Sequence, residues 1–388
     1  MQKLVEIRYG LGLSQWPAYV IDTRGQHVCA PLEDLEEGKI PASAMVESEE
    51  CCCTKSLGSE DLHAQGLPQF EVIAPPSCEA LQRFRVPEAE AKQAVPKRPL
   101  PCCGNLRALR LRLPQRKLLD GQTAERTVLP IVFTGEVSEG CYLKLEVERL
   151  AEWHIVLLTV KAEQPLYLEV EQAEGSRLQL DILKHPGFST WQLLAWRAEL
   201  GRDAHLSHHS INLDSSAYQV GQVHLNGEGS SLESASSSLI PHYEQQRLDI
   251  NVDHHAPHTQ SSVMNHAVVQ GSGRGVYAVR GKIDKSASDS DCQQESRFLT
   301  LSPSAVAQSY PVLLIDDYDV KAGHASSVGS IDEETLFYLQ SRGLSRESAQ
   351  QLLTIAFLDP AIHGLVAGSA GRLDSLGRYL KRYLLERV

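Results

Sequence analysis

Short runs of alternating apolar and polar residues recur between Leu106 and Ile315, and this pattern most limits what the chain can fold into. Successive side chains of a β-strand point to opposite faces, so a period of two predicts a half-buried strand. The runs recur at intervals of roughly 10 to 15 residues, with Gly, Ser, Asp or Pro between them. No helical pattern separates them, which predicts an all-β body. Clear examples are Leu143, Leu145 and Val147; Leu166, Leu168 and Val170; Leu178, Leu180 and Ile182; and Leu248, Ile250 and Val252.

A sandwich or a closed barrel is the commonest arrangement of such strands. Two features favour a β-helix instead. The strands extend over about 200 residues, which is long for one sandwich. Small residues also crowd the stretch VHLNGEGSSLESASSSLI, and stacked turns of a β-helix need small side chains. Although no strict repeat length is present, the sequence predicts a mainly β protein with a β-helix core.

Helical periodicity replaces the alternation after Ser330. Ser330-x-x-Glu333 is a capping-box pattern, and Asp332 is a competing N-cap. The helix should end at Gly343, a favourable residue just beyond a helix C-terminus. Its residues are too apolar and aromatic to be buried entirely within a small appendage, and aromatic residues of this kind are typical interface anchors. They are Leu336, Phe337, Tyr338 and Leu339.

Two more helices are expected after this one. Ser345 caps the first of them, and Asp359-Pro360 should end it. Its apolar residues recur at helical spacing, namely Ala349, Leu352, Leu353 and Ala356. The last helix carries Leu373, Leu376, Leu380 and Leu384 on one face. Residues 330–388 are therefore predicted to form a small helical domain behind a β-helix core of residues 106–329.

The first 105 residues have no sustained period and carry Pro-rich and acidic stretches. They are predicted to form an irregular, partly helical region with a short helix at Pro87–Gln93 and a linker at 94–105. Nine cysteines are present, including Cys51, Cys52 and Cys53 in one run and Cys102 and Cys103 in another. Because no C-x-x-C spacing occurs, reduced thiols are favoured over a zinc site or a disulfide framework.

Composition and charge exclude several classes of protein. The formal net charge of -12 argues against nucleic-acid binding, which needs clustered Lys and Arg. No apolar run approaches the length of about 20 residues that a membrane-spanning helix needs. The N-terminus lacks the apolar core of a secretory signal, so a cytoplasmic location is expected.

Motifs for enzymatic chemistry are missing from the sequence. The glycine-rich stretch GSGRGV at 271–276 is neither a Walker A nor a dinucleotide-binding sequence, and it precedes a strand. No G-x-S-x-G elbow occurs, and no cysteine lies in a recognisable nucleophile context. The residues alone therefore predict neither nucleotide binding nor catalysis.

Histidines are the richest chemical signal in the chain. They form one group at His205, His208 and His209 and a second in DHHAPHT, while His324 stands alone between small residues. The spacing of HHAPH does not converge on one point within a strand, nor does it match the helical H-E-x-x-H pattern. Solvated or hydrogen-bonded structural roles are therefore favoured for His254, His255 and His258.

The C-terminal half closely resembles the SufB/SufD family of iron–sulfur cluster assembly scaffolds. Three stretches carry the resemblance: DINVDHHAPHTQSSVMNHAVVQGSGRGVYAVRGKI, FLTLSPSA, and PVLLIDDYDVKAGHASSVGSIDEETLFYLQSRGLSRESAQQLLTIAFLDPAI. The ending LKRYLLERV and the AGH form of the histidine segment look more like SufD than SufB. The resemblance implies a right-handed β-helix followed by a helical domain. It also implies a non-catalytic subunit that pairs with a SufB-like scaffold and binds the ABC-type ATPase SufC through its C-terminal helices.

The family also implies a site. The histidine matching His324 is implicated in forming the nascent cluster where the two scaffolds meet, and neutral imidazole is a good iron ligand. Some family members have a cysteine where this chain has Ala322, so the partner must complete the ligand set. No cofactor is expected to bind stably to the chain alone; iron or an iron–sulfur cluster would be held transiently in the complex. ATPase docking is expected at Leu336, Phe337, Tyr338, Leu339 and Arg342.

Two other interpretations stay open at this stage. One is a SufB-like scaffold that works as a homo-oligomer or homodimer. The other is a carbohydrate-active β-helix enzyme, a class that uses paired carboxylates or calcium. The sequence decides neither the full ligand set nor whether a flavin is used.

Overall fold

The computed structural model describes residues 17–22, 27–31, 69–77, 80–81, 84, 106–115, 127–134, 140–160, 165–184, 192–367 and 373–388. The short helix expected at Pro87–Gln93, the linker at 94–105 and the two cysteine runs lie outside these ranges. Among the helices of the described residues, none combines the length and the apolarity that crossing a membrane requires.

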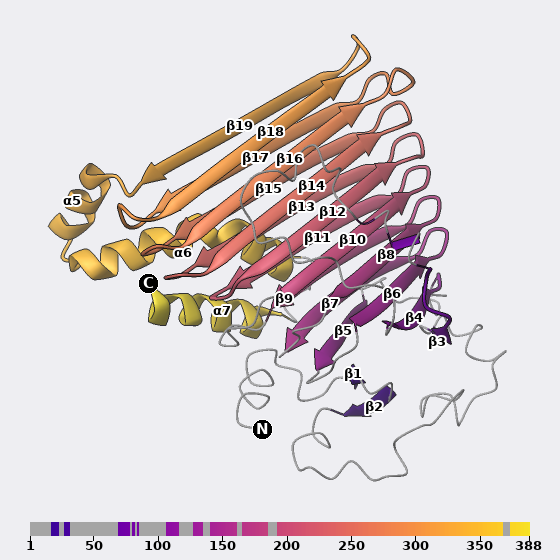
Figure 1. Cartoon of the computed structure of the whole chain (residues 1–388), viewed down its shortest axis with the longest axis horizontal. Helices are drawn as coiled ribbons and strands as arrows, with labels where there is room; N and C mark the ends of the chain where they lie inside the picture. Colours follow the sequence, from indigo (N-terminus) through magenta and orange to yellow (C-terminus); the bar gives the residue numbers. More distant parts are fainter. Residues whose placement is uncertain are drawn as a thin grey trace, which may run out of the picture.

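The described strands form two long sheets (Figure 1). Sheet A contains, in spatial order, β19 (Lys321–Ser330), β17 (Asp291–Thr300), β15 (Gln260–Val269), β13 (Ser231–Ile240), β11 (His205–Leu213), β9 (Arg177–Lys184), β7 (Glu152–Val160), β5 (Thr127–Thr134), β1 (Pro17–Asp22) and β2 (His27–Pro31). Sheet B contains β18 (Val306–Ile315), β16 (Arg274–Ile283), β14 (Gln245–His254), β12 (Ala217–Leu225), β10 (Gln192–Leu200), β8 (Leu166–Gln172), β6 (Gly140–Val147), β4 (Leu106–Leu113) and β3 (Gln69–Ile73).

From β4 onward, consecutive strands join opposite sheets, and each strand pairs in parallel with the strand two places further along. This is the topology of a β-solenoid, so the predicted β-helix core is confirmed and a sandwich is wrong. Ser231, Gln260, Asp291 and Lys321 stand side by side in successive turns, at sequence spacings of 29, 31 and 30 residues. The variable spacing explains why the sequence shows no strict repeat.

Three of these strands, β1 to β3, come from residues before 105, where the sequence showed only short periodic pieces. β1 pairs in parallel with β5 and antiparallel with β2, whereas β3 pairs antiparallel with β4. They extend the two sheets at the end of the solenoid opposite β18 and β19. The predicted domain limits at 105 and 330 remain predictions.

Alternate residues of both sheets fill the interior of the solenoid. Leu248, Ile250 and Val252 of β14 are buried there with residues of every neighbouring turn. The interior also holds Trp196, whose indole leaves no room for a side chain on the next strand. A Cβ added to Gly221 would lie 2.7 Å from the indole Nε1, so only glycine fits opposite this tryptophan.

Helices α6 (Arg346–Ala367) and α7 (Asp374–Arg387) pack against the outer face of sheet A (Figure 1). The four leucines predicted for the last helix are all buried against this face. The apolar residues of sheet A that meet the two helices are Val128, Val156, Leu158, Leu183, Ile211, Leu213, Leu239 and Val268. The predicted C-terminal helical region is therefore confirmed, and its packing is shared with the solenoid.

The prediction that Asp359-Pro360 ends a helix is wrong, because α6 continues through Pro360 to Ala367. Proline removes a backbone donor from the helix and normally breaks it. Here side chains of sheet A bond to carbonyl oxygens of the preceding turn. Ser237 Oγ donates to the Leu358 carbonyl at 2.7 Å, and His266 Nδ1 lies 2.7 Å from the Phe357 carbonyl. Packing and hydrogen bonds from the sheet thus override the local signal.

The buried face of α6 also differs from the expected one. Leu352 is 48% exposed and Ala356 is exposed, although both were expected to face inward with Ala349. The helix extends to Ala367, eight residues beyond the predicted end at Asp359, and its second half makes the contact with sheet A. The residues that bury there are Leu358, Ala361, Ile362 and Leu365.

Candidate functional site: the last turn of the solenoid and helix α5

Strands β18 and β19 form the last turn of the solenoid, and each is the terminal strand of its sheet. β18 pairs with β16 and β19 pairs with β17, so each has a neighbour on one side. The other edge of each strand presents backbone N–H and C=O groups, which another chain can pair with. Both edges belong to the same end of the molecule (Figure 1).

The apolar core is open at this end. Val328 lies beside Phe298 in the register, yet Val328 is 53% exposed while Phe298 is 2% exposed. Ile315 lies beside Ile283 in the same way, at 45% against 0%. The side chains that a further turn would cover are therefore exposed at this end of the core. An exposed apolar end of this kind marks a protein-binding surface.

His324 lies in the middle of β19, beside Gln294 of β17. Gln294 is buried, whereas His324 is exposed because no further turn covers it. No hydrogen bond or ion pair ties the imidazole to another residue in the described part of the chain. Its neighbours Gly323 and Ala325 carry no side chain large enough to shield it. The ring is therefore free to bind a metal ion or a partner group.

No thiolate is available beside this histidine within the described residues. Ala322 of β19 lies beside Cys292 of β17, and the Cys292 side chain is buried. Burial is the main cause that raises the pKa of the Cys292 thiol, so the thiol stays protonated. A cluster or an iron ion at His324 would therefore need further ligands from elsewhere, as the family resemblance implies.

Helix α5 (Glu333–Ser341) follows β19 directly and projects from this end of the molecule (Figure 1). Asp332 is its N-cap, because its carboxylate accepts a hydrogen bond from the Thr335 N–H at 2.8 Å. Gly343 follows the C-cap with a φ of +96°, as predicted for the end of this helix. The short helix thus begins and ends at the residues that the sequence predicted.

Most of the residues predicted for partner binding lie on the outside of α5. Phe337 is 73% exposed, Tyr338 is 55% exposed, and the Arg342 guanidinium lies over the Tyr338 ring at 5.3 Å. Leu339 is half-buried. Leu336 needs a correction, because it is 1% exposed and packs inward, so it holds α5 in place rather than forming the surface.

Two more exposed apolar residues follow α5 in the chain. Leu344 in the loop after α5 is 36% exposed, and Leu352 on α6 is 48% exposed. Arg346 forms a two-pronged ion pair with Glu333 at 2.6 and 2.9 Å, which ties the start of α6 to the start of α5. We call Phe337, Tyr338, Leu344 and Leu352 the α5–α6 surface. The sequence analysis missed Leu352 as a surface residue, because helical periodicity predicted that its side chain would be buried.

The histidines of the solenoid interior have structural roles, as expected. His254 is buried, with Nδ1 2.8 Å from Thr259 Oγ1 and Nε2 2.8 Å from Ser261 Oγ. Burial lowers its pKa to about 4. His208 is buried against the Trp196 ring with centroids 4.4 Å apart, and desolvation lowers its pKa to about 3. Both rings are neutral packing elements.

Fold and exposed end together define a β-solenoid protein whose last turn and adjoining helix leave apolar side chains exposed. The family model described as "SUF system FeS cluster assembly, SufBD core domain" matches residues 142–357, more than half of the chain. The chain therefore belongs to the SufBD family. The matched range covers most of the solenoid, including His324, and also helix α5.

Similar proteins carry the same family names. The chain is 37% identical over 122 residues to the iron–sulfur cluster assembly protein SufD of Bacillus subtilis, covering 31% of this chain and 28% of that protein. It is 30% identical over 159 residues to SufD of Escherichia coli, covering 41% and 38%. A SufBD family protein of Mycobacterium tuberculosis is 28% identical over 256 residues, covering 63% and 64%. The matched segments thus span less than two thirds of each relative.

Proposed function

We propose that this chain is a SufD-like, non-catalytic scaffold subunit of an iron–sulfur cluster assembly complex. In this complex the last turn of the solenoid pairs with a SufB-like scaffold, and the α5–α6 surface docks a SufC-like ABC ATPase. Iron or the nascent cluster is the cargo, held transiently at the junction of the two scaffolds. The location of the complex in the cytoplasm stays a prediction.

The observation that carries the proposal is the exposure of core positions in β18 and β19. A solenoid ends stably when its last turn is covered or polar. Val328 and Ile315 are neither, and burying their apolar surface against a partner is favourable by about 25 cal/mol per Å². The open strand edges add backbone hydrogen bonds to such a contact.

His324 gives this junction its chemistry. It is the exposed imidazole of the terminal turn, and it lies on the strand whose apolar positions would be covered by the partner. An imidazole placed there would share the metal with ligands supplied by the partner. Partner ligands are needed because Cys292, which is buried and protonated, does not offer a thiolate. The chain's part is to hold one imidazole in place on a rigid strand while the partner completes the set.

The α5–α6 surface supports the second contact. Aromatic residues exposed on a short helix, with an arginine lying over one ring, are the residue types that dominate protein interfaces. The surface stands next to the last turn in the chain, so nucleotide-driven movement of a docked ATPase would act close to the scaffold junction. The absence of a Walker A sequence from this chain fits a subunit that relies on another chain for ATP.

The experiment is co-purification of the chain with SufB-like and SufC-like proteins, with masses read by light scattering. Val328→Asp places a charge in the proposed junction and should weaken pairing with the SufB-like protein at least tenfold. The matched control is Tyr243→Asp, because Tyr243 is 85% exposed in a turn far along the chain from β19. The control should pair normally.

Equal pairing by both variants would overturn the proposed junction. A second outcome distinguishes the SufB-like alternative. If the chain alone forms a homodimer that Val328→Asp abolishes, and the SufB-like protein does not displace it, the terminal turn binds a second copy and the heteromeric proposal is wrong.

A further inference from the structure

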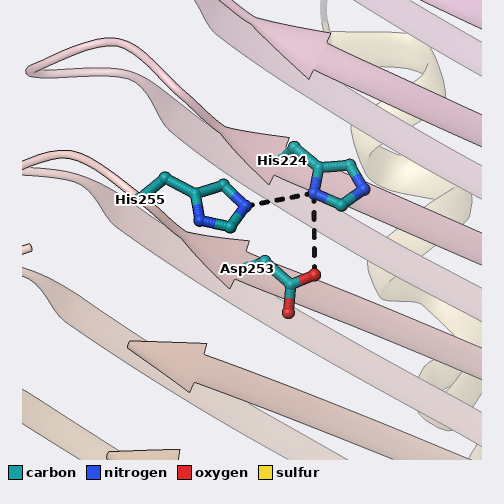
Figure 2. A group of neighbouring side chains, drawn as sticks. All are labelled: His224, Asp253 and His255. Carbon is teal, nitrogen blue, oxygen red and sulfur yellow. Dashed lines mark hydrogen bonds and ion pairs between the residues drawn. The ribbon is translucent and has the colours of Figure 1, made fainter. Parts of the chain in front are cut away.

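A group of metal-binding side chains lies on the outer face of sheet B, away from the last turn. His224 is the penultimate residue of β12, Asp253 is the penultimate residue of β14, and His255 follows β14 directly. His224 and Asp253 stand side by side in the register, one turn of the solenoid apart. Figure 2 shows the His255 ring and the Asp253 carboxylate both approaching Nδ1 of His224.

The distances suit a single ion. His224 Nδ1 lies 3.2 Å from His255 Nε2 and 3.6 Å from Asp253 Oδ2. Two ligand atoms bound at about 2.0–2.1 Å to one tetrahedral ion are about 3.3 Å apart. One potential ligand atom from each residue lies within 4.8 Å of the others. The backbone register therefore brings three donors to nearly the spacing of a coordination sphere.

Neighbouring charges hold these donors in orientation. His255 Nδ1 donates to Asp284 Oδ2 at 2.6 Å, which leaves its Nε2 lone pair facing His224. A carboxylate that fixes the remote nitrogen of a ligating imidazole is the usual second-shell arrangement of metal sites. Lys282 binds the other oxygen of Asp284 at 2.6 Å, and Arg280 binds Asp253 Oδ1 at 3.0 Å. Asp253 Oδ2 is thus the oxygen left for an ion.

The donor set selects the class of ion. Two imidazole nitrogens and one carboxylate oxygen suit divalent first-row transition metals, whereas Mg²⁺ and Ca²⁺ prefer sets made of oxygen alone. Asp253 and Asp284 are balanced by Arg280 and Lys282, so simple charge attraction does not favour a hard cation here. The His224 and Asp253 side chains are 16% and 14% exposed and His255 is 34% exposed, so an ion could still enter from solvent.

We propose that His224, Asp253 and His255 bind one divalent first-row transition-metal ion on the outer face of sheet B. This site is separate from His324 and does not depend on the scaffold role. Without an ion, Nδ1–H of His224 donates to Nε2 of His255. When the ion binds Nδ1 of His224, the ring carries its proton on Nε2 instead and stays neutral. The Nε2 atom of His224 has no hydrogen-bond partner within the described residues. The orientation of the His224 ring therefore depends on the contacts that its Nδ1 atom makes.

The test measures Co²⁺ binding to the full chain by visible absorption and equilibrium dialysis. Accessible cysteines are first alkylated with N-ethylmaleimide, so that thiolates do not bind the probe. His255→Asn and Asp253→Asn should each lower the affinity of one Co²⁺ site at least tenfold. His258→Asn is the matched control, since His258 is exposed and lies three residues after His255, outside the group. The Co²⁺ affinity of this variant should stay within twofold of the wild type.

Two results would overturn the proposal. The first is that no Co²⁺ absorption band of the wild type is lost in His255→Asn. The second is that millimolar Mg²⁺ competes effectively with Co²⁺. Asp253→Asn keeps the shape of the side chain, so normal circular dichroism together with lost binding distinguishes loss of a ligand from loss of fold. Unchanged binding in folded Asp253→Asn and His255→Asn would mean that the group is only a hydrogen-bonded cluster.

Discussion

Helix α6 rests on a buried histidine, and one glycine makes this contact possible. A Cβ added to Gly364 would overlap the imidazole of His209, with Cε1 only 2.9 Å away. The His209 ring cannot turn aside freely, because its Nδ1 lies 2.7 Å from Asp181 Oδ1. Asp181 is fully buried and also bonded to His154. Burial by itself would raise the pKa of its carboxyl, but the hydrogen bonds and charges of the two histidines together outweigh burial and lower that pKa. Gly364→Ala therefore pushes α6 away from sheet A.

The size of the effect follows from competing contributions. Gly→Ala in a helix interior is favourable by about 1 kcal/mol. Overpacking costs about 1–3 kcal/mol, and the bond from Gln179 Nε2 to the Gly364 carbonyl, 3.2 Å long, would lose about 1 kcal/mol. The expected net loss of unfolding free energy is about 1–3 kcal/mol. In a His209→Ala background the obstacle is gone, and the same substitution should stabilise by about 0.5–1 kcal/mol.

The assay is urea unfolding of the wild type, both single variants and the double variant, combined in a double-mutant cycle. A coupling energy of about 1.5–4 kcal/mol is expected. Gly377→Ala in α7 is the control, because its Cβ would lie 2.7 Å from a methyl group of Val366 and would not meet the His209 ring. If Gly364→Ala changes the unfolding free energy equally with and without the His209 ring, α6 does not pack on His209 at Gly364 as inferred.

Three further predictions concern docking, pH and cofactor content. The double variant Phe337→Ala, Tyr338→Ala should weaken binding of the SufC-like ATPase at least tenfold in a titration. The control Leu385→Ala, at a 46% exposed position on α7, should not weaken it. Equal affinities of the two variants would remove the α5–α6 surface from the proposal. Burial lowers the pKa of His254 from 6.5 to about 4, so the unfolded chain binds this proton at a higher pH than the folded chain does. The unfolding free energy should therefore drop by about 2 kcal/mol between pH 7 and pH 5. Below pH 4 this group should cause no further loss. His254→Gln should flatten that fall in urea titrations at each pH. The chain purified alone should be colourless and should not hydrolyse ATP; a stable visible absorption band from a cluster would contradict this.

The sequence predicted the strands and the last helix because burial imposes their periods directly. Val223 and Leu225 alternate since both face the interior, and Leu380 and Leu384 recur at helical spacing since both press on sheet A. The cap at Asp332 was likewise visible, because capping depends on neighbouring residues.

What the sequence could not show depends on contacts between distant residues. Pro360 lies within α6 because Ser237 and His266, about a hundred residues earlier, bond to the helix. The group of His224 and His255 depends on the register between two turns, and the variable turn length hides that register. Considering HHAPH within a single strand therefore missed the histidine one turn away.

The central claim is that the last turn holds cargo through His324, and cluster yield in an intact complex tests it most directly. The complex with SufB-like and SufC-like proteins is reconstituted with iron and sulfide, and cluster content is measured by absorption on preparations of verified mass. His324→Ala should assemble normally yet lower the yield at least tenfold, and His324→Cys should restore part of it, since thiolate also binds iron. His242→Ala, which changes another exposed histidine, should keep the full yield. A normal cluster yield from an intact His324→Ala complex would contradict the account.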